Sequence, residues 1–135
     1  MYDELHRRSK ALMQRAPVRL SSEARIVVRD VMVESLLRDG IELAALCVDD
    51  HHFHILARFP DRDPRRWIGM AKRRSARELS KRGLAPLGGV WAKRFRALPI
   101  NDRDHARNTF RYILGHARTG AAVWRPRRTA QPDAV

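Results

Sequence analysis

The sequence of 135 residues contains a single cysteine, Cys47, and no apolar run that approaches the length of a membrane span. One cysteine excludes an internal disulfide and the cysteine-rich zinc sites, and it is typical of a reducing cytoplasm. A membrane span needs about 18 consecutive apolar residues, and the N-terminal segment MYDELHRRSK also lacks the apolar stretch of a secretory signal. We therefore expect a cytoplasmic protein that has no membrane partner.

Internal repeats and low-complexity tracts are absent as well, and the length suits one hydrophobic core. A hydrophobic fraction of 44% together with 32% charged residues excludes wholesale disorder. We predict one folded domain over residues 17–124, preceded by an arm or helix over residues 1–16. Residues 125–135 are basic and then polar, and we expect them to form a disordered tail.

Acidic residues are scarce in the second part of the chain. Residues 51–135 contain 20 Lys and Arg against 6 Asp and Glu, whereas residues 1–50 contain 8 against 9, so the net charge of +13 comes from the second part. A field of this sign attracts polyanions, and nucleic acid binds such proteins through phosphate neutralisation and counterion release. The charge therefore favours a nucleic-acid partner. A solvated basic face, or association with ribosomes without catalysis, is the alternative.

Hydrophobic periodicity and helix-capping residues divide the folded part into three helices and four short extended segments. Asp63 before Pro64 is typical of a helix start, and the first two helices end at a glycine. The turn at residues 49–51 joins two strand-like segments into a β-hairpin. This order predicts an α+β fold with helices against an antiparallel sheet. The predicted helices cover residues 23–39, 64–82 and 102–117, and the extended segments cover residues 41–48, 52–59, 90–92 and 95–98.

Two histidines flank a phenylalanine in the second strand of the predicted hairpin, as His52, Phe53 and His54. Side chains alternate between the two faces of a strand, so both imidazoles project to one face and the phenylalanine to the other. Two nitrogen ligands near one point can hold a divalent metal. Two histidines on a solvated face of a sheet, without a metal, are the structural alternative.

The last predicted helix carries a phenol and an imidazole on one face. Tyr112 and His116 are four residues apart and therefore neighbours on the helix surface, with Asn108 one turn earlier. The apolar positions Phe110 and Ile113 lie on other sides of the helix. This polar face is a candidate reactive site, and a structural tyrosine that caps the core is the alternative.

These segments together resemble a known family. The stretch VDDHHFHILARF resembles the metal-binding strand of the HUH-type single-strand transposases, in particular the REP-associated tyrosine transposases and their insertion-sequence relatives. The stretch GGVWAKRFRALPINDRDHARNTFRYILGHARTGAAVW resembles the segment of that family that runs from a Gly-x-Val-Trp strand through the helix of the nucleophilic tyrosine. The order and spacing match over about residues 17–124.

The resemblance implies a ferredoxin-like antiparallel sheet packed against helices, with His52 and His54 holding Mg²⁺ or Mn²⁺ and Tyr112 acting as the nucleophile. His116 stands where the family has Gln or Asn as a further metal ligand, and a third nitrogen ligand favours softer metals such as Mn²⁺ or Zn²⁺. His51 stands where the family usually has Asn or Asp. The family's first strand has no counterpart ahead of residue 17.

The implied function is that of a transposase: a metal-dependent endonuclease and strand transferase that acts on single-stranded or hairpin DNA through a 5′-phosphotyrosine. Members of the family act as monomers or homodimers, and the cellular DNA would place the protein at the nucleoid. The predicted helix over residues 64–82 would hold DNA phosphates. Its basic residues are Arg65, Arg66, Lys72, Arg73, Arg74, Arg77, Lys81 and Arg82.

Two alternatives from other classes stay open. One is a domesticated or degenerate nucleic-acid-binding protein that has lost cleavage, which the departure at His116 and the missing first strand favour. The other is a small metal hydrolase that uses His52, His54 and His116 on an unrelated substrate. The positive charge argues against the hydrolase, because a small neutral substrate needs no such field.

Overall fold

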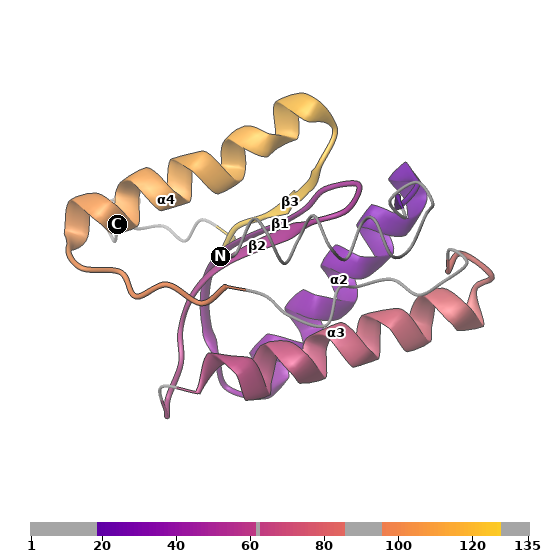
Figure 1. Ribbon diagram of the computed structural model, residues 1–135, viewed down its shortest axis with the longest axis horizontal. Helices are drawn as coiled ribbons and strands as arrows, with labels where there is room; N and C mark the ends of the chain where they lie inside the picture. Colours follow the sequence, from indigo (N-terminus) through magenta and orange to yellow (C-terminus); the bar gives the residue numbers. More distant parts are fainter. Residues whose placement is uncertain (1–18, 62, 86–95, 128–135) are drawn as a thin grey trace, which may run out of the picture.

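A computed structural model describes residues 19–61, 63–85 and 96–127. The N-terminal arm expected over residues 1–16, the extended segment expected over residues 90–92 and the end of the expected tail lie outside the described residues. In chain order, the elements are α2 (Ser22–Arg38), β1 (Glu42–Val48), β2 (Phe53–Arg58), α3 (Pro64–Lys81), α4 (Arg103–Gly115), the 3₁₀ helix η1 (His116–Thr119) and β3 (Ala122–Trp124) (Figure 1).

The three helices begin after N-cap residues, and the first two end before a glycine, as the sequence predicts. Ser21, Asp63 and Asp102 each accept a hydrogen bond from a backbone N–H in the first turn of the helix that follows. After α2 and α3 the chain turns at Gly40 and Gly83, whose φ angles of 79° and 69° favour a residue without a Cβ. All three predicted helices are confirmed, and α4 ends slightly earlier than expected because the chain tightens into η1.

The sheet has the strand order β2-β1-β3 and is antiparallel throughout. The predicted hairpin is confirmed as β1 and β2, and Cys47 is paired with His54 in their register. On the other side of β1, Leu46 is paired with Trp124 of β3. The strand β1 is therefore central, as its nearly continuous apolar sequence indicates.

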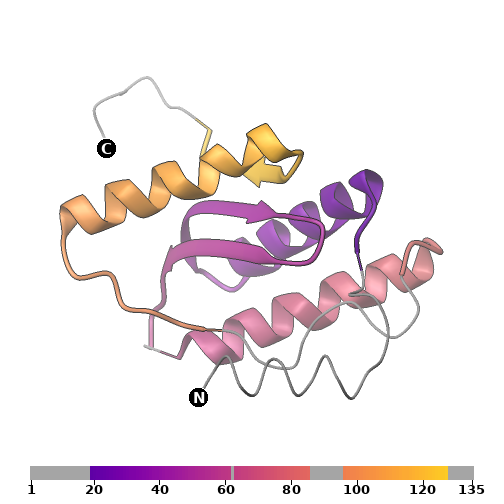
Figure 2. The ribbon, with the colours of Figure 1, turned by 45° about the horizontal axis from the view of Figure 1, so that its top comes forward.

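Helices cover both faces of this sheet (Figures 1 and 2). The helices α2 and α3 pack on one face around a large apolar core, whose fully buried members include Met32, Leu36, Leu46 and Leu79. The helix α4 packs on the other face through Ile113, over a smaller cluster with Ala45 and Cys47 of β1 and Ala121 before β3. The sheet therefore separates α4 from α3.

The α+β class and the antiparallel sheet packed against helices are confirmed. The described residues form three strands, so the ferredoxin-like detail stays a prediction. Of the extended segment expected at residues 95–98, residues 96–98 belong to the described chain, and they form no strand there. The sequence prediction missed β3, since no extended segment was expected at residues 122–124. None of the helices within the described ranges is long and apolar enough to cross a membrane.

Truncation of Leu46 to alanine tests the larger core. Leu46 is a residue of β1 and is fully buried in the core that α2 and α3 cover. Leu46→Ala is therefore expected to lower the free energy of unfolding by about 3 kcal/mol, because apolar burial is lost and a cavity is left. Urea denaturation measures this change. The control Leu37→Ala removes a side chain that is 48% exposed on α2, and it is expected to cost well under half as much. Equal losses in the two variants would contradict this placement of the core.

Candidate active site

The two histidines of the hairpin lie on the face of the sheet that α4 covers. Phe53 and Ile55 of β2 pack against the core with α2 and α3, so His54 between them faces the other way. His52 precedes β2 directly, and its ring centroid lies 6.2 Å from that of His54. The alternation predicted for this triplet therefore holds.

The helix α4 brings a tyrosine and a third histidine against His54. The ring centroid of Tyr112 lies 5.5 Å from that of His54, in an edge-to-face arrangement. The ring centroid of His116 lies 4.9 Å from that of His54 and 4.7 Å from that of Tyr112. Residues more than 50 positions apart in the sequence thus form one cluster of a phenol and imidazoles.

The solvent exposure of Tyr112 differs from that of His54 and His116 beside it. Tyr112 is 60% exposed, although it is a large aromatic residue. A tyrosine that caps the core would be largely covered, so this exposure argues against the structural alternative for Tyr112. His54 and His116 are half-buried beside it, and His52 is exposed. The phenol is therefore accessible to a large substrate, while the rings of His54 and His116 beside it are less exposed.

The hydrogen bond of His116 fixes which ring nitrogen is available. Nδ1 of His116 lies 2.9 Å from the backbone carbonyl oxygen of Tyr112, one helical turn earlier. A carbonyl oxygen only accepts, so Nδ1 carries the proton and donates it. In the neutral ring Nε2 then keeps its lone pair, which is the form that a metal or an incoming proton requires.

Burial and neighbouring positive charge both lower the pKa values of the two strand histidines. For His54, desolvation by burial is the largest cause, followed by the charges of His116 and His52. For His52, desolvation is again the largest cause, followed by the charge of His51. A lowered pKa keeps an imidazole neutral near pH 7, and the neutral ring is the one that ligates a metal.

The turn before these histidines is held by a carboxylate. Asp50 lies 2.5 Å from Nδ1 of His51 and 2.6 Å from a guanidinium nitrogen of Arg19. The hydrogen bond from His51 is the largest cause that lowers the pKa of Asp50. The ring of His51 in turn lies on that of His52, with centroids 3.6 Å apart. The sequence prediction placed Asp50 and His51 in this turn and noted His51 as a departure from the family, but it gave Asp50 and Arg19 no role at the site.

The donors of this cluster fit a divalent metal by their chemistry, since neutral imidazole nitrogens bind such ions. Within the described ranges, no group of three or more His, Cys, Asp or Glu side chains is arranged to hold a metal. The rings of His54 and His116, which come from distant parts of the chain, have their centroids 4.9 Å apart. Ligation by His52, His54 and His116 together stays a prediction.

Comparison with protein families identifies the chain. The family model "Transposase IS200 like" matches residues 11–116, more than three quarters of the sequence. The chain belongs to the IS200-like transposase family. The matched range contains both strand histidines and Tyr112, and it ends at His116. No match was found among curated proteins or among solved structures. The predicted family is confirmed, and with it a DNA-processing enzyme that binds DNA.

The basic helix of this IS200-like transposase lies on the far face of the sheet from Tyr112. Ile68, Ala71 and Leu79 of α3 are buried, and most of its basic side chains point outward. Lys72 is half-buried, and desolvation lowers its pKa. The exposed members of the predicted DNA-binding set are Arg65, Arg66, Arg73, Arg77, Lys81 and Arg82.

Some members of that set have partners within the protein. Arg74 donates to Oγ of Ser35 at 2.6 Å and forms an ion pair with Asp39 at 3.4 Å, which joins α3 to α2. Arg82 forms an ion pair with Glu78 at 2.8 Å. These part-buried contacts give Arg74 a structural role in the transposase, because an attachment to α2 competes with a phosphate.

A second basic surface runs along α4, the helix that carries Tyr112, and the sequence prediction left it out. Arg103, Arg107 and Arg111 follow one another at four-residue spacing along α4, and all three are exposed. Arg118 on η1 is exposed as well. The four-residue spacing is visible in the sequence and could have pointed to this surface. These arginines share the helix of Tyr112 or follow it directly, whereas α3 packs on the other face of the sheet.

The lowered pKa values predict how the stability of the transposase depends on pH. Between the ordinary value of 6.5 and the lower folded values, unfolded histidines bind protons that folded His52 and His54 do not. The free energy of unfolding should therefore fall as the pH drops below 6.5, and it should level off below the folded pKa values. Urea titrations without added metal, from pH 7.5 to pH 5, measure this. The double variant His52→Gln, His54→Gln should flatten the fall, and an unchanged slope would contradict the prediction.

Proposed function

We propose that this transposase is a metal-dependent single-strand DNA endonuclease and strand transferase with Tyr112 as its nucleophile. The observation that carries the proposal is the exposed phenol of Tyr112, packed edge-on against the imidazoles of His54 and His116. An exposed tyrosine beside imidazoles, in a family of DNA-processing enzymes, has both a route to the substrate and groups to activate the attack.

The reaction is a transesterification at a phosphodiester of single-stranded DNA. The phenol oxygen of Tyr112 attacks phosphorus, the bond from phosphorus to the 3′-oxygen breaks, and the 5′-phosphate stays on the tyrosine. The phenol loses one proton and the leaving 3′-oxygen gains one, so the charges balance. One phosphodiester replaces another, and a later 3′-hydroxyl can reverse the step and join strands without ATP.

A phenol with a pKa of about 10 is a weak nucleophile at neutral pH, so the phosphate needs activation. We propose that His52, His54 and His116 hold Mg²⁺ or Mn²⁺, and three nitrogen ligands favour Mn²⁺ of the two. A bound divalent ion would polarise the phosphate oxygens and stabilise the charge of the transition state. The Nδ1 bond to the carbonyl of Tyr112 orients the ring of His116, so its Nε2 serves as the ligand atom.

The substrate class follows from the two basic surfaces. We propose that Arg107 and Arg111 of α4 bind phosphates near the cleaved bond, because both are exposed on the helix that carries Tyr112. The exposed arginines of α3 lie across the sheet and bind another part of the same DNA, such as a hairpin stem. Single-stranded DNA that folds into a hairpin supplies both parts.

A covalent-adduct assay tests the proposal. The purified protein is incubated with labelled single-stranded oligonucleotides that carry hairpins, with Mn²⁺ in one arm and EDTA in the other. We expect a protein–DNA adduct that survives denaturant in the Mn²⁺ arm and is absent in the EDTA arm. An adduct of equal yield in EDTA would contradict the metal dependence, and no adduct in either arm would contradict the nuclease.

A second candidate is a DNA-binding protein of the same family that no longer cleaves. It is favoured by His116, which stands where the family has an amide side chain. This candidate predicts salt-sensitive DNA binding with no adduct in either arm of the assay. The presence of an adduct therefore separates the two candidates directly.

The contribution of α3 to binding can be measured through salt. Arg73, Arg77 and Lys81 are exposed and form no ion pair with other described residues. Each phosphate contact contributes about 0.7 (single strand) to about 0.9 (duplex stem) to the slope of log affinity against log salt, so the triple change to Gln should reduce the slope by about 2 to 3. The control Arg38→Gln on α2 removes one exposed charge that is paired with Glu34, and it should leave the slope nearly unchanged. An unchanged slope in the triple variant would exclude α3 from the interface.

A further inference from the structure

The candidate active site is built from two separate pieces. The histidine strand is β2 with His52 directly ahead of it, and the tyrosine helix is α4 with His116 directly after it. The apolar cluster that joins them is small, with Ala45, Cys47, Ile113 and Ala121 as its buried members. Apolar contacts are not directional and by themselves allow small shifts of a helix over a sheet. A phenol and an imidazole that act on one phosphate need a tighter geometry than such a cluster supplies.

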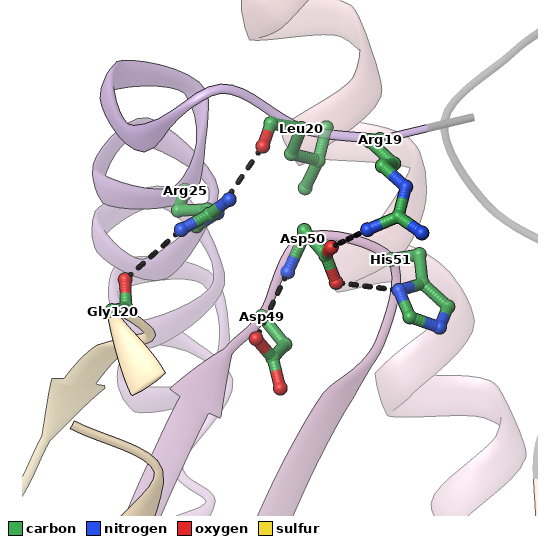
Figure 3. Close-up of polar contacts among 7 residues, drawn as sticks. All are labelled: Arg19, Leu20, Arg25, Asp49, Asp50, His51 and Gly120. Carbon is green, nitrogen blue, oxygen red and sulfur yellow. Dashed lines mark hydrogen bonds and ion pairs between the residues drawn. The ribbon is translucent and has the colours of Figure 1, made fainter. Parts of the chain in front are cut away.

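Arg25 of α2 supplies directional contacts between these two pieces (Figure 3). Its Nη1 donates to the carbonyl oxygen of Gly120 at 3.1 Å, and its Nε donates to the carbonyl oxygen of Leu20 at 3.1 Å. Gly120 lies 95 positions away in the chain. One half-buried guanidinium thus bonds the turn after α4 and the segment before α2 at the same time.

The Leu20 end of this contact leads to the histidines. The backbone N–H of Leu20 donates to the carbonyl oxygen of Asp50 at 2.5 Å, and the Leu20 side chain is buried in the main core. Asp50 holds His51, whose ring lies on that of His52. Leu20 therefore fixes the turn from which the histidine strand starts.

The Gly120 end leads to His116. Gly120 has a φ of 90° and closes η1, and the N–H of the next residue, Ala121, donates to the carbonyl oxygen of His116 at 3.2 Å. The hydroxyl of Thr119 donates to the same carbonyl oxygen at 2.9 Å. A shift of Gly120 would therefore move the backbone of His116 and the end of α4.

We propose that Arg25 is a positioning residue that sets the separation of the histidine strand and the tyrosine helix. It touches neither Tyr112 nor any histidine of the cluster, and it acts through Leu20 and Gly120. Arg29, one turn further along α2, adds a weaker bond to the carbonyl oxygen of Val123 at 3.4 Å. The catalytic consequence of this role rests on the proposed function, but the geometric role does not.

The variant Arg25→Lys is the most direct test. Lysine keeps the charge and hence the attraction for DNA, but its single ammonium lacks the planar fork that bonds two carbonyl oxygens in fixed directions. The matched control is Arg38→Lys, on the same helix and also charge-conserving, whose partner Glu34 is remote from both pieces.

The main readout is the NOE between the ring protons of His54 and His116, recorded without metal or DNA. The Tyr112–His116 NOE is the internal reference, because both residues sit at one end of the same helix. We expect Arg25→Lys to weaken the His54–His116 NOE relative to the reference, and Arg38→Lys to leave the ratio unchanged. An unchanged ratio in folded Arg25→Lys would overturn the proposal.

Should Arg25→Lys fail to fold, Arg25→Gln decides. The glutamine amide can still donate to one backbone carbonyl, but it lacks the guanidinium fork that bonds both, and the bonds of Thr119 and Ala121 to His116 are untouched. We expect a fall in the NOE ratio, and an unchanged ratio in this folded variant would overturn the proposal.

The adduct assay then connects the geometry to chemistry. Arg25→Lys is expected to form the adduct about 10-fold to 100-fold more slowly, with DNA affinity unchanged, because a small misplacement of reacting groups costs that much. If the NOE ratio falls and wild type forms no adduct, the proposed function fails and the positioning role stands. If wild type forms the adduct and the NOE ratio is unchanged in Arg25→Lys, the positioning role fails alone.

Discussion

Replacement of Tyr112 by phenylalanine is expected to lower adduct formation by about 10⁴-fold or more, since the change removes the nucleophilic oxygen. The ring contacts with His54 and His116 are made by the aromatic body, which phenylalanine keeps. At 60% exposure the phenol contributes little to the core, so the folded state should be retained. DNA affinity in a salt titration should also stay close to that of wild type, because no charge is lost. Denaturing gels of the Mn²⁺ reactions measure the adduct directly.

The chain supplies a matched control for this variant. Tyr2 is the other of the two tyrosines, and Tyr2→Phe should form the adduct at the wild-type rate. Because the two variants make the same chemical change, a general effect of losing a phenol would appear in both. An adduct that persists in Tyr112→Phe, or one that is lost in Tyr2→Phe, would assign the nucleophile elsewhere.

Local patterns were sufficient for the elements that short-range chemistry determines. Ser21, Asp63 and Asp102 cap the three helices as their side chains predict, and Gly40 ends α2. The orientation of His52 and His54 follows from strand alternation alone. The proximity of Tyr112 and His116 follows equally from their four-residue spacing on a helix.

Those local patterns could not predict contacts between distant segments of the chain. The meeting of β2 and α4 was implied by the family resemblance, since no periodicity relates His54 to Tyr112. The strand β3 was missed because Ala122–Trp124 is too short to show alternation, and its pairing with β1 stabilises it. The placement of α3 across the sheet from α4 depends on how whole layers pack. No sequence pattern points to the role of Arg25, because the two oxygens that it bonds are backbone carbonyls, which every residue has.

The second large effect is expected for His54→Ala, which should slow adduct formation by about 10²-fold to 10³-fold at a fixed Mn²⁺ concentration. His54 is the ring that contacts both Tyr112 and His116, so its loss removes a proposed ligand and one wall of the cluster. A higher Mn²⁺ concentration should recover part of the rate, because a site with one ligand fewer binds the ion more weakly. The measurement is the adduct rate as a function of Mn²⁺ concentration.

The control His105→Ala separates a role as a metal ligand from a general loss of a histidine. His105 lies on the same helix as Tyr112, and its Nδ1 accepts a hydrogen bond from the backbone N–H of Asn101 at 3.1 Å, so its removal affects only the start of α4. This variant should keep both the wild-type rate and the wild-type Mn²⁺ requirement. A slow His54→Ala enzyme with an unchanged Mn²⁺ requirement would show that the ring shapes the cluster without holding the ion. The pair of Mn²⁺ curves therefore tests the metal site itself, independently of the identity of the nucleophile.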